Sequence, residues 1–193
     1  LTNRSSGRMG YALAEAARDR GGHAVLITAP TALPDPIGME LVRVRTAQEM
    51  HDAVMQATAD ADALIMAAAV ADFRPARTEE RKIKKGEERI TLELARTPDI
   101  LHEARGSFLR VGFAAESENL VENATRKLRE KELDLIVANQ AGGPEDAFGT
   151  ESSQVTIIDR EGKTESLPLL SKADVAHRVL DRVADLLAKT GKA

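Results

Sequence analysis

The sequence contains no cysteine and no tryptophan, and only 3% of its residues are aromatic. The lack of cysteine excludes a disulfide framework, a thiolate metal site and a cysteine nucleophile. The shortage of aromatic rings argues against a platform on which nucleic-acid bases stack. No apolar run approaches the roughly 20 residues that span a bilayer. We therefore expect no nucleic-acid partner and no membrane segment, and the missing cysteines suit the cytoplasm.

The composition that remains is typical of one globular domain, with 42% hydrophobic and 30% charged residues in 193 and a net charge of −4. Strand-like and helix-like segments alternate. The apolar run 61–71 predicts a central parallel strand buried on both faces. Residues 155–158 and 166–169 predict a hairpin. The expected fold is a Rossmann-like α/β fold of three layers, with a mostly parallel sheet, helices on both faces and an added β-hairpin.

A glycine-punctuated loop runs directly into the first helical pattern. Ser5, Gly7 and Gly10 follow the dinucleotide-binding spacing G-x-G-x-x-G, with serine in the first place. Such a loop directs backbone N–H groups and the positive end of a helix dipole at an anion. We expect Gly7 to let a phosphate approach the backbone and Gly10 to let the helix pack closely on a strand.

Polar residues follow the predicted strands, where α/β sheets bind ligands. Asp72 could hold a sugar hydroxyl, a base amino group or Mg²⁺, or it could cap a helix. Asn3 and Asn139 could stabilise an oxyanion or occupy turns. The lysine cluster 82–85 could clamp a triphosphate or form a solvated charge run.

Lys127 and Lys131 are four residues apart and share a helix face, where like charges repel by a few tenths of a kcal/mol. A bound anion could offset this repulsion, and so could neighbouring carboxylates: Glu122, Glu130 and Glu132. The four histidines show no metal-ligand spacing, which indicates structural or surface roles.

Six motifs occur together in a specific order: residues 2–10, 67–75, 82–85, 97–100, 111–116 and 137–139. Together they resemble the phosphopantothenate–cysteine ligases (phosphopantothenoylcysteine synthetases), the ligase domain of bifunctional bacterial coenzyme A biosynthesis proteins. The resemblance covers essentially the whole chain. It implies ligation of 4′-phosphopantothenate with L-cysteine through an acyl-cytidylate, using CTP and Mg²⁺ and releasing pyrophosphate and CMP. It also implies a homodimer that completes the active site.

Position by position, the resemblance implies catalytic roles for Asn3 and Lys82. The implied substrate-binding residues are Asn3, Ser5, Ser6, Gly7, Gly10, Ala68, Ala69 and Asp72. The implied CTP-binding residues are Met66, Ala67, Ala68, Asp72, Lys82, Thr97, Pro98, Asp99, Ile100, Phe113, Lys127 and Lys131. Metal ligands are not identified.

The chain departs from the family pattern in three respects. Thr97 replaces the usual asparagine of its turn, and Ser153 stands where members often have an asparagine. Because only two residues precede Asn3 and the chain begins at Leu1, we interpret 1–193 as a single ligase domain truncated at its N-terminus. A first strand with an arginine, and any flavin-dependent decarboxylase domain with its FMN, would then be absent.

Two other functions compete with the ligase. A Rossmann oxidoreductase that binds NAD(P) would share the glycine loop, but it needs an acidic residue after the second strand. Here Ala29, Pro30 and Thr31 follow that strand instead. A non-catalytic nucleotide-binding subunit is the other alternative, and the presence of Asn3 and Lys82 argues against it.

Overall fold

The structure is a computed structural model that describes residues 5–77, 91–140 and 151–191. Its helices are α1 (Arg8–Asp19), α2 (Ala47–Ala57), the short 3₁₀ helix η1 (Thr58–Asp60), α3 (Ile100–Glu103), α4 (Leu120–Glu130) and α5 (Lys172–Lys189). Its strands are β1 (Val25–Thr28), β2 (Glu40–Arg43), β3 (Ala63–Met66), β4 (Phe73–Pro75), β5 (Leu94–Arg96), β6 (Leu109–Glu116), β7 (Leu135–Gln140), β8 (Ser152–Ser153), β9 (Val155–Asp159), β10 (Thr164–Ser166) and β11 (Leu170–Ser171).

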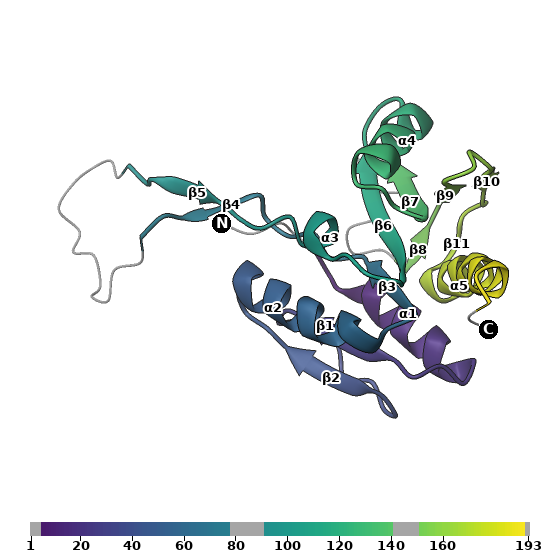
Figure 1. Cartoon of the computed structure of the whole chain (residues 1–193), viewed down its shortest axis with the longest axis horizontal. Coiled ribbons are helices and arrows are strands. Elements are labelled where there is room, and N and C mark those ends of the chain that lie inside the picture. Colours follow the sequence, from purple (N-terminus) through teal and green to yellow (C-terminus); the bar gives the residue numbers. More distant parts are fainter. Residues whose placement is uncertain (1–4, 78–90, 141–150, 192–193) are drawn as a thin grey trace.

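The main sheet has five strands in the order β10-β9-β7-β6-β3 (Figure 1). Strands β3, β6 and β7 are parallel, whereas β9 runs antiparallel to β7 and forms a hairpin with β10. The Asp159 carboxylate accepts the backbone N–H of Lys163 at 2.9 Å and thereby closes the hairpin turn. The predicted hairpin is confirmed.

Helices cover both faces of the main sheet because successive side chains of a strand point to opposite faces. On β6 and β7, Val111 and Val137 pack with α1 and α5. On the other face, Ile136 and Ala138 of β7 pack with Leu128 of α4. The three-layer α/β arrangement with a mostly parallel sheet is therefore confirmed.

The helices α2, α3 and α5 begin at a side-chain cap. The Thr46 hydroxyl accepts the N–H of Glu49 at 3.1 Å, and the Asp99 carboxylate accepts the N–H of His102 at 3.2 Å. At α5, the Ser171 hydroxyl accepts the N–H of Asp174 at 3.1 Å. Such bonds satisfy orphan donors of a first helical turn.

The prediction of a central strand at 61–71 is wrong. Strand β3 covers only Ala63–Met66, it is the last strand of the main sheet, and all four of its residues are half-buried. Its outer edge is not paired with any described strand. Strands β1 and β2 form a separate parallel pair next to α2. The sheet is thus divided between β1 and β3.

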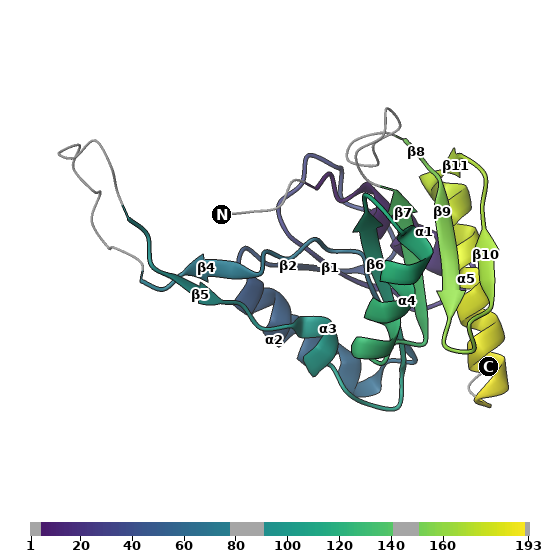
Figure 2. The same cartoon turned by 90° about the horizontal axis from the view of Figure 1, so that it is seen from above.

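Strands β4 and β5 form an antiparallel hairpin that extends from the body as an arm (Figures 1 and 2). Its apolar side chains are largely exposed: Phe73, Leu92 and Leu94. The Arg96 guanidinium lies 5.8 Å from the centre of the Phe73 ring. An arm with exposed apolar groups is a typical feature of a surface that binds another chain.

Candidate functional site

A cavity of about 150 Å³ lies at the N-terminus of α1, beside the carboxyl ends of β3, β6 and β7. We call it the anion pocket. Its walls bring together eight of the residues expected at the site: Ser5, Ser6, Gly7, Gly10, Ala67, Ala68, Ala69 and Phe113. These residues come from three separate segments. The sheet therefore assembles them where α/β folds bind ligands.

The N-terminus of α1 offers backbone donors to this pocket. Gly7 is the N-cap residue, and within the described residues α1 has no side-chain cap and no acidic residue in its first turn. Its first N–H groups are therefore left for a ligand or water. The N–H of Gly7 itself donates to the Ser5 hydroxyl at 3.3 Å.

The two glycines of the loop serve different purposes. Gly7 has a φ of 75°, and a Cβ there would lie 2.8 Å from the Thr31 Cγ2. A left-handed backbone and a close neighbour both favour glycine at this position. At Gly10, a Cβ would meet none of the described atoms within 4 Å. The close helix–strand packing expected at Gly10 is thus not found among the described residues.

Sequence reasoning missed two cationic residues in the walls of the anion pocket, Arg8 and Lys172. Lys172 is the first residue of α5, and only 7% of it is exposed. Burial, with a smaller contribution from Arg8, lowers the pKa of Lys172 below its ordinary value. Nothing in the local sequence singles out this lysine, because only the fold brings the start of α5 to the loop before α1.

The described residues do not identify ligands for the expected Mg²⁺. Those that line the anion pocket include no carboxylate, and the described chain holds no cluster of three His, Cys, Asp or Glu residues. Mg²⁺ prefers oxygen ligands and is often held largely by substrate phosphates, so the requirement for this ion stays a prediction.

Several other expected CTP contacts lie outside the walls of the anion pocket and form ion pairs. The Lys131 ammonium is 3.0 Å from an Asp99 carboxylate oxygen, and the Lys127 ammonium is 2.6 Å from the Glu116 carboxylate. The second contact is an ion pair without hydrogen-bond geometry. Two residues expected to bind CTP, Asp99 and Lys131, are therefore brought together.

The carboxylates next to these lysines in the sequence have other partners. Glu130 pairs with Arg126, and Glu132 pairs with Arg105. The carboxylates that offset the repulsion between the two lysines therefore come from β6 and from the turn before α3. In the described structure, Lys127 and Lys131 therefore form ion pairs with carboxylates that are distant in the sequence.

Thr97 joins two of the predicted segments. Its hydroxyl donates to the Ala71 carbonyl at 2.5 Å, and its N–H donates to the Asp72 carbonyl at 3.0 Å. Asp99 caps the helix α3 that follows this turn. Asp72 precedes strand β4, so the alternative that it caps a helix is wrong.

The remaining predicted residues occupy other positions. Met66 packs between the main sheet and α2, and Ile100 is buried in the core beneath that helix. Pro98 lies between Thr97 and Asp99 in the turn before α3. Asn139 lines the anion pocket from within β7, so its alternative role as a turn residue is wrong. The two residues expected to be catalytic, Asn3 and Lys82, lie outside the described residues.

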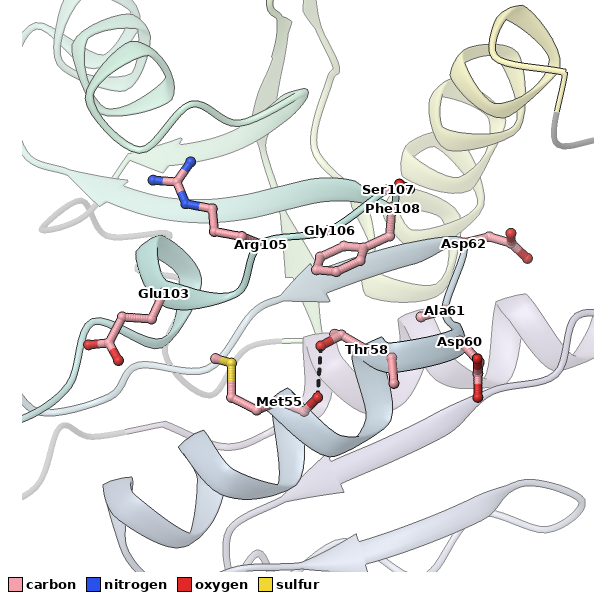
Figure 3. A pocket seen from close by; sticks show the side chains of 11 residues that line it. Met55, Thr58, Asp60, Ala61, Asp62, Glu103, Arg105, Gly106, Ser107 and Phe108 are labelled. Atoms are coloured by element: carbon pink, nitrogen blue, oxygen red, sulfur yellow. Dashed lines mark hydrogen bonds between the residues drawn. The ribbon is translucent and has the colours of Figure 1, made fainter.

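A larger cavity of about 400 Å³ lies at the opposite, amino ends of β3 and β6 (Figure 3). None of the predicted residues lines it. Four charged residues line it: Asp60, Asp62, Glu103 and Arg105. Glu103 and Arg105 point away from the Phe108 ring, and they pair with His51 and Glu132. We therefore place the candidate site at the anion pocket.

The protein is similar along its whole length to proteins of coenzyme A biosynthesis. The family model of the DNA/pantothenate metabolism flavoprotein C-terminal domain matches residues 1–187. The chain is 42% identical to the coenzyme A biosynthesis bifunctional protein CoaBC of Bacillus subtilis (strain 168), over 100% of this chain and 48% of that protein. It thus spans about half the length of the curated relatives it matches.

Two solved structures share the fold. The crystal structure of the C-terminal domain of a CoaBC protein has a TM-score of 0.82 and 40% identity, covering 98% of this chain and 87% of that one. A Cab2 mutant in complex with phosphopantothenate-cysteine has a TM-score of 0.74 and 18% identity, covering 98% and 81%. At that identity the second similarity concerns the fold alone. Among the described helices, none combines the length and apolarity needed to cross a bilayer.

Proposed function

Because the chain belongs to the family of the DNA/pantothenate metabolism flavoprotein C-terminal domain, we propose that it catalyses the CTP-dependent ligation of 4′-phosphopantothenate with L-cysteine. The observation that carries this proposal is the anion pocket, in which the glycine loop, the segment after β3 and Phe113 meet. The names of the relatives support a role in coenzyme A biosynthesis, since the chain is 42% identical to a bifunctional protein of that process. A cytoplasmic location is part of the same proposal.

The proposed reaction has two steps. A carboxylate oxygen of phosphopantothenate attacks the α-phosphorus of CTP, and the bond to pyrophosphate breaks. The amine of cysteine then attacks the acyl carbon of the acyl-cytidylate. The bond between that carbon and the bridging oxygen breaks, CMP leaves with the oxygen, and the amine loses a proton to give the amide.

The site residues contribute binding and charge stabilisation. The uncapped backbone N–H groups at the start of α1 are donors for a phosphoryl oxygen of a substrate. The Phe113 ring in the pocket wall offers an apolar surface to a substrate. Lys82 is proposed to assist the first step and Asn3 to bind phosphopantothenate and process the acyl-cytidylate.

We further propose that the protein is a homodimer and that the arm formed by β4 and β5 contributes to the interface. The exposed apolar side chains of the arm support this assignment. Asp72 directly precedes the arm, and Thr97 directly follows it. A second protomer seated on the arm would therefore lie next to residues expected to contact CTP.

Pyrophosphate release tests the proposed function. We expect release with CTP and 4′-phosphopantothenate, formation of the amide only when cysteine is added, and much weaker release with ATP. The assay is made on the 193-residue chain and on any longer natural protein that contains it. If neither releases pyrophosphate, the ligase proposal fails.

The same protein samples separate the alternatives. A fluorescence titration that shows tight NADPH binding without CTP binding would favour an oxidoreductase. CTP binding that never leads to pyrophosphate release would favour a non-catalytic subunit. In that case the substitutions Asn3→Ala and Lys82→Gln would leave the measurable properties of the protein unchanged.

A further inference from the structure

Lys172 is a buried cation that the expected ligase residues do not include. It begins α5, 172 residues into the chain, yet it shares a cavity wall with the loop that precedes α1. Only 7% of the residue is exposed. A charged ammonium is costly to bury unless its surroundings compensate the charge.

The ammonium is held at the edge of the anion pocket by β8. It donates to the Ser153 hydroxyl at 3.1 Å and to the Ser152 carbonyl at 3.4 Å. Strand β8 in turn pairs with β11, directly before α5. Ser153 also lines the pocket, so its hydroxyl and the Lys172 ammonium belong to the same cavity as the uncapped N-terminus of α1.

The ionisable side chains among the described lining residues are Arg8 and Lys172, and these residues include no carboxylate. Arg8 also forms an ion pair with the Glu151 carboxylate, 3.1 Å away, which is not among the lining residues. The two cations are close enough that Arg8 contributes to lowering the pKa of Lys172, after the larger effect of burial. Two neighbouring cations and a helix N-terminus all favour a negatively charged occupant.

We propose that Lys172 is a phosphate-binding residue of the anion pocket, where its ammonium and the Ser153 hydroxyl bind a phosphoryl group that the backbone of α1 contacts from the other side. This deepens the proposed function, on which the identification of the ligand as a phosphate compound rests. The serine at position 153, where the ligase family often has asparagine, thereby gains a role as a hydroxyl donor beside the lysine.

The test compares ligands with and without phosphate on the 193-residue chain. Inorganic pyrophosphate, CTP and cytidine are titrated by calorimetry against the wild type and three variants. Lys172→Met removes the charge and keeps the length of the side chain. Lys172→Arg restores the charge. Lys189→Met is the matched control, because Lys189 ends the same helix with an exposed side chain.

We expect Lys172→Met to weaken binding of pyrophosphate and CTP by about ten- to a hundredfold, which is the contribution of a hydrogen bond to a charged group. Cytidine binding and the melting temperature stay close to wild type, Lys172→Arg recovers part of the affinity, and Lys189→Met binds as the wild type does. Unchanged pyrophosphate affinity in Lys172→Met overturns the proposal. So does an equal loss for cytidine and pyrophosphate with a lowered melting temperature, which would make Lys172 a purely structural residue.

The binding test of Lys172 and the ligase assay can succeed or fail separately. If pyrophosphate binding depends on Lys172 but the protein never forms the amide, the assignment of Lys172 stands and the proposed function fails. If the protein forms the amide and Lys172→Met binds pyrophosphate as tightly as the wild type, the proposed function stands and the assignment fails. A wild type that binds no pyrophosphate also overturns the assignment.

Discussion

At the residue scale, the substitution Gly10→Ala should change folding stability and ligand affinity in opposite directions. It lies in the first turn of α1, lines the anion pocket, and has open space around a Cβ among the described atoms. Gly10→Ala should stabilise the fold by about 0.5–1 kcal/mol, because alanine loses less conformational entropy in a helix than glycine does. The added methyl enters the pocket, so CTP binding should weaken. Thermal melting and calorimetry measure the two effects.

Gly7→Ala is the matched comparison within the same loop. It should destabilise the fold by about 1–2 kcal/mol, because the left-handed φ of 75° is unfavourable for alanine and its Cβ would approach Thr31. If Gly10→Ala bound CTP as tightly as the wild type, the ligand would not approach the α1 backbone, and the assignment of the anion pocket would be wrong.

At the scale of elements, the sequence predicts those helix and strand ends that are determined by bonds between residues close together in the chain. Thr46, Asp99 and the hairpin turn at Asp159 each make the bonds that begin or end an element within a few residues. The arm was not predicted, because its strands β4 and β5 are each three residues long and lie far apart in the sequence.

In the candidate site, too, local features could be predicted from the sequence and long-range contacts could not. The loop before α1 could be recognised from its glycine spacing, and the left-handed backbone at Gly7 requires one of these glycines. Lys172 could not, because its place in the pocket depends on the packing of α5 beside α1 and on the pairing of β8 with β11. Long-range contacts of this kind leave no periodic signal in the sequence.

The contact between α2 and α3 should depend on pH. His51 on α2 lies 3.1 Å from the Glu103 carboxylate on α3 and 2.8 Å from the Asp52 carboxylate. The hydrogen bond to Asp52 is the main cause that raises the pKa of His51 above its ordinary 6.5. A raised pKa means that the folded state holds the proton more tightly, so this stabilisation is fully present below pH 6.5 and is lost as pH rises through the folded-state pKa.

His51→Gln should therefore destabilise the protein more at pH 5.5 than at pH 8.5, as measured by urea unfolding at both values. His23→Gln, at an exposed histidine outside these contacts, is the control. An equal loss at the two pH values would show that the ionised form of His51 does not stabilise the fold through its carboxylate contacts.

At the scale of the whole molecule, the sheet is divided between β1 and β3, and α1 packs against elements on both sides of the division. Among the described strands, β3 pairs only with β6, whereas β6 pairs with both β3 and β7. The backbone amides of β3 should therefore exchange with solvent faster than those of β6 in hydrogen exchange. Equal protection of the two strands would contradict the position of β3 at the edge of the main sheet.

The arm makes a prediction about assembly. Substituting Phe73→Ser and Leu94→Ser together should shift the protein from dimer to monomer in sedimentation, because both side chains are 44% exposed on the arm. Ile37→Ser is the matched control, since Ile37 is 85% exposed in the loop before β2. A dimer that survives the arm substitutions, or dissociates equally in the control, would contradict the assignment of the interface.

The most direct test of the central claim follows an oxygen atom. 4′-Phosphopantothenate labelled with ¹⁸O in both carboxylate oxygens is incubated with the protein, CTP and cysteine, and the CMP is analysed by mass spectrometry. If the carboxylate is activated as an acyl-cytidylate, each CMP formed with the amide carries one ¹⁸O in its phosphate. Amide formation with unlabelled CMP, or no amide at all from CTP, would contradict the account.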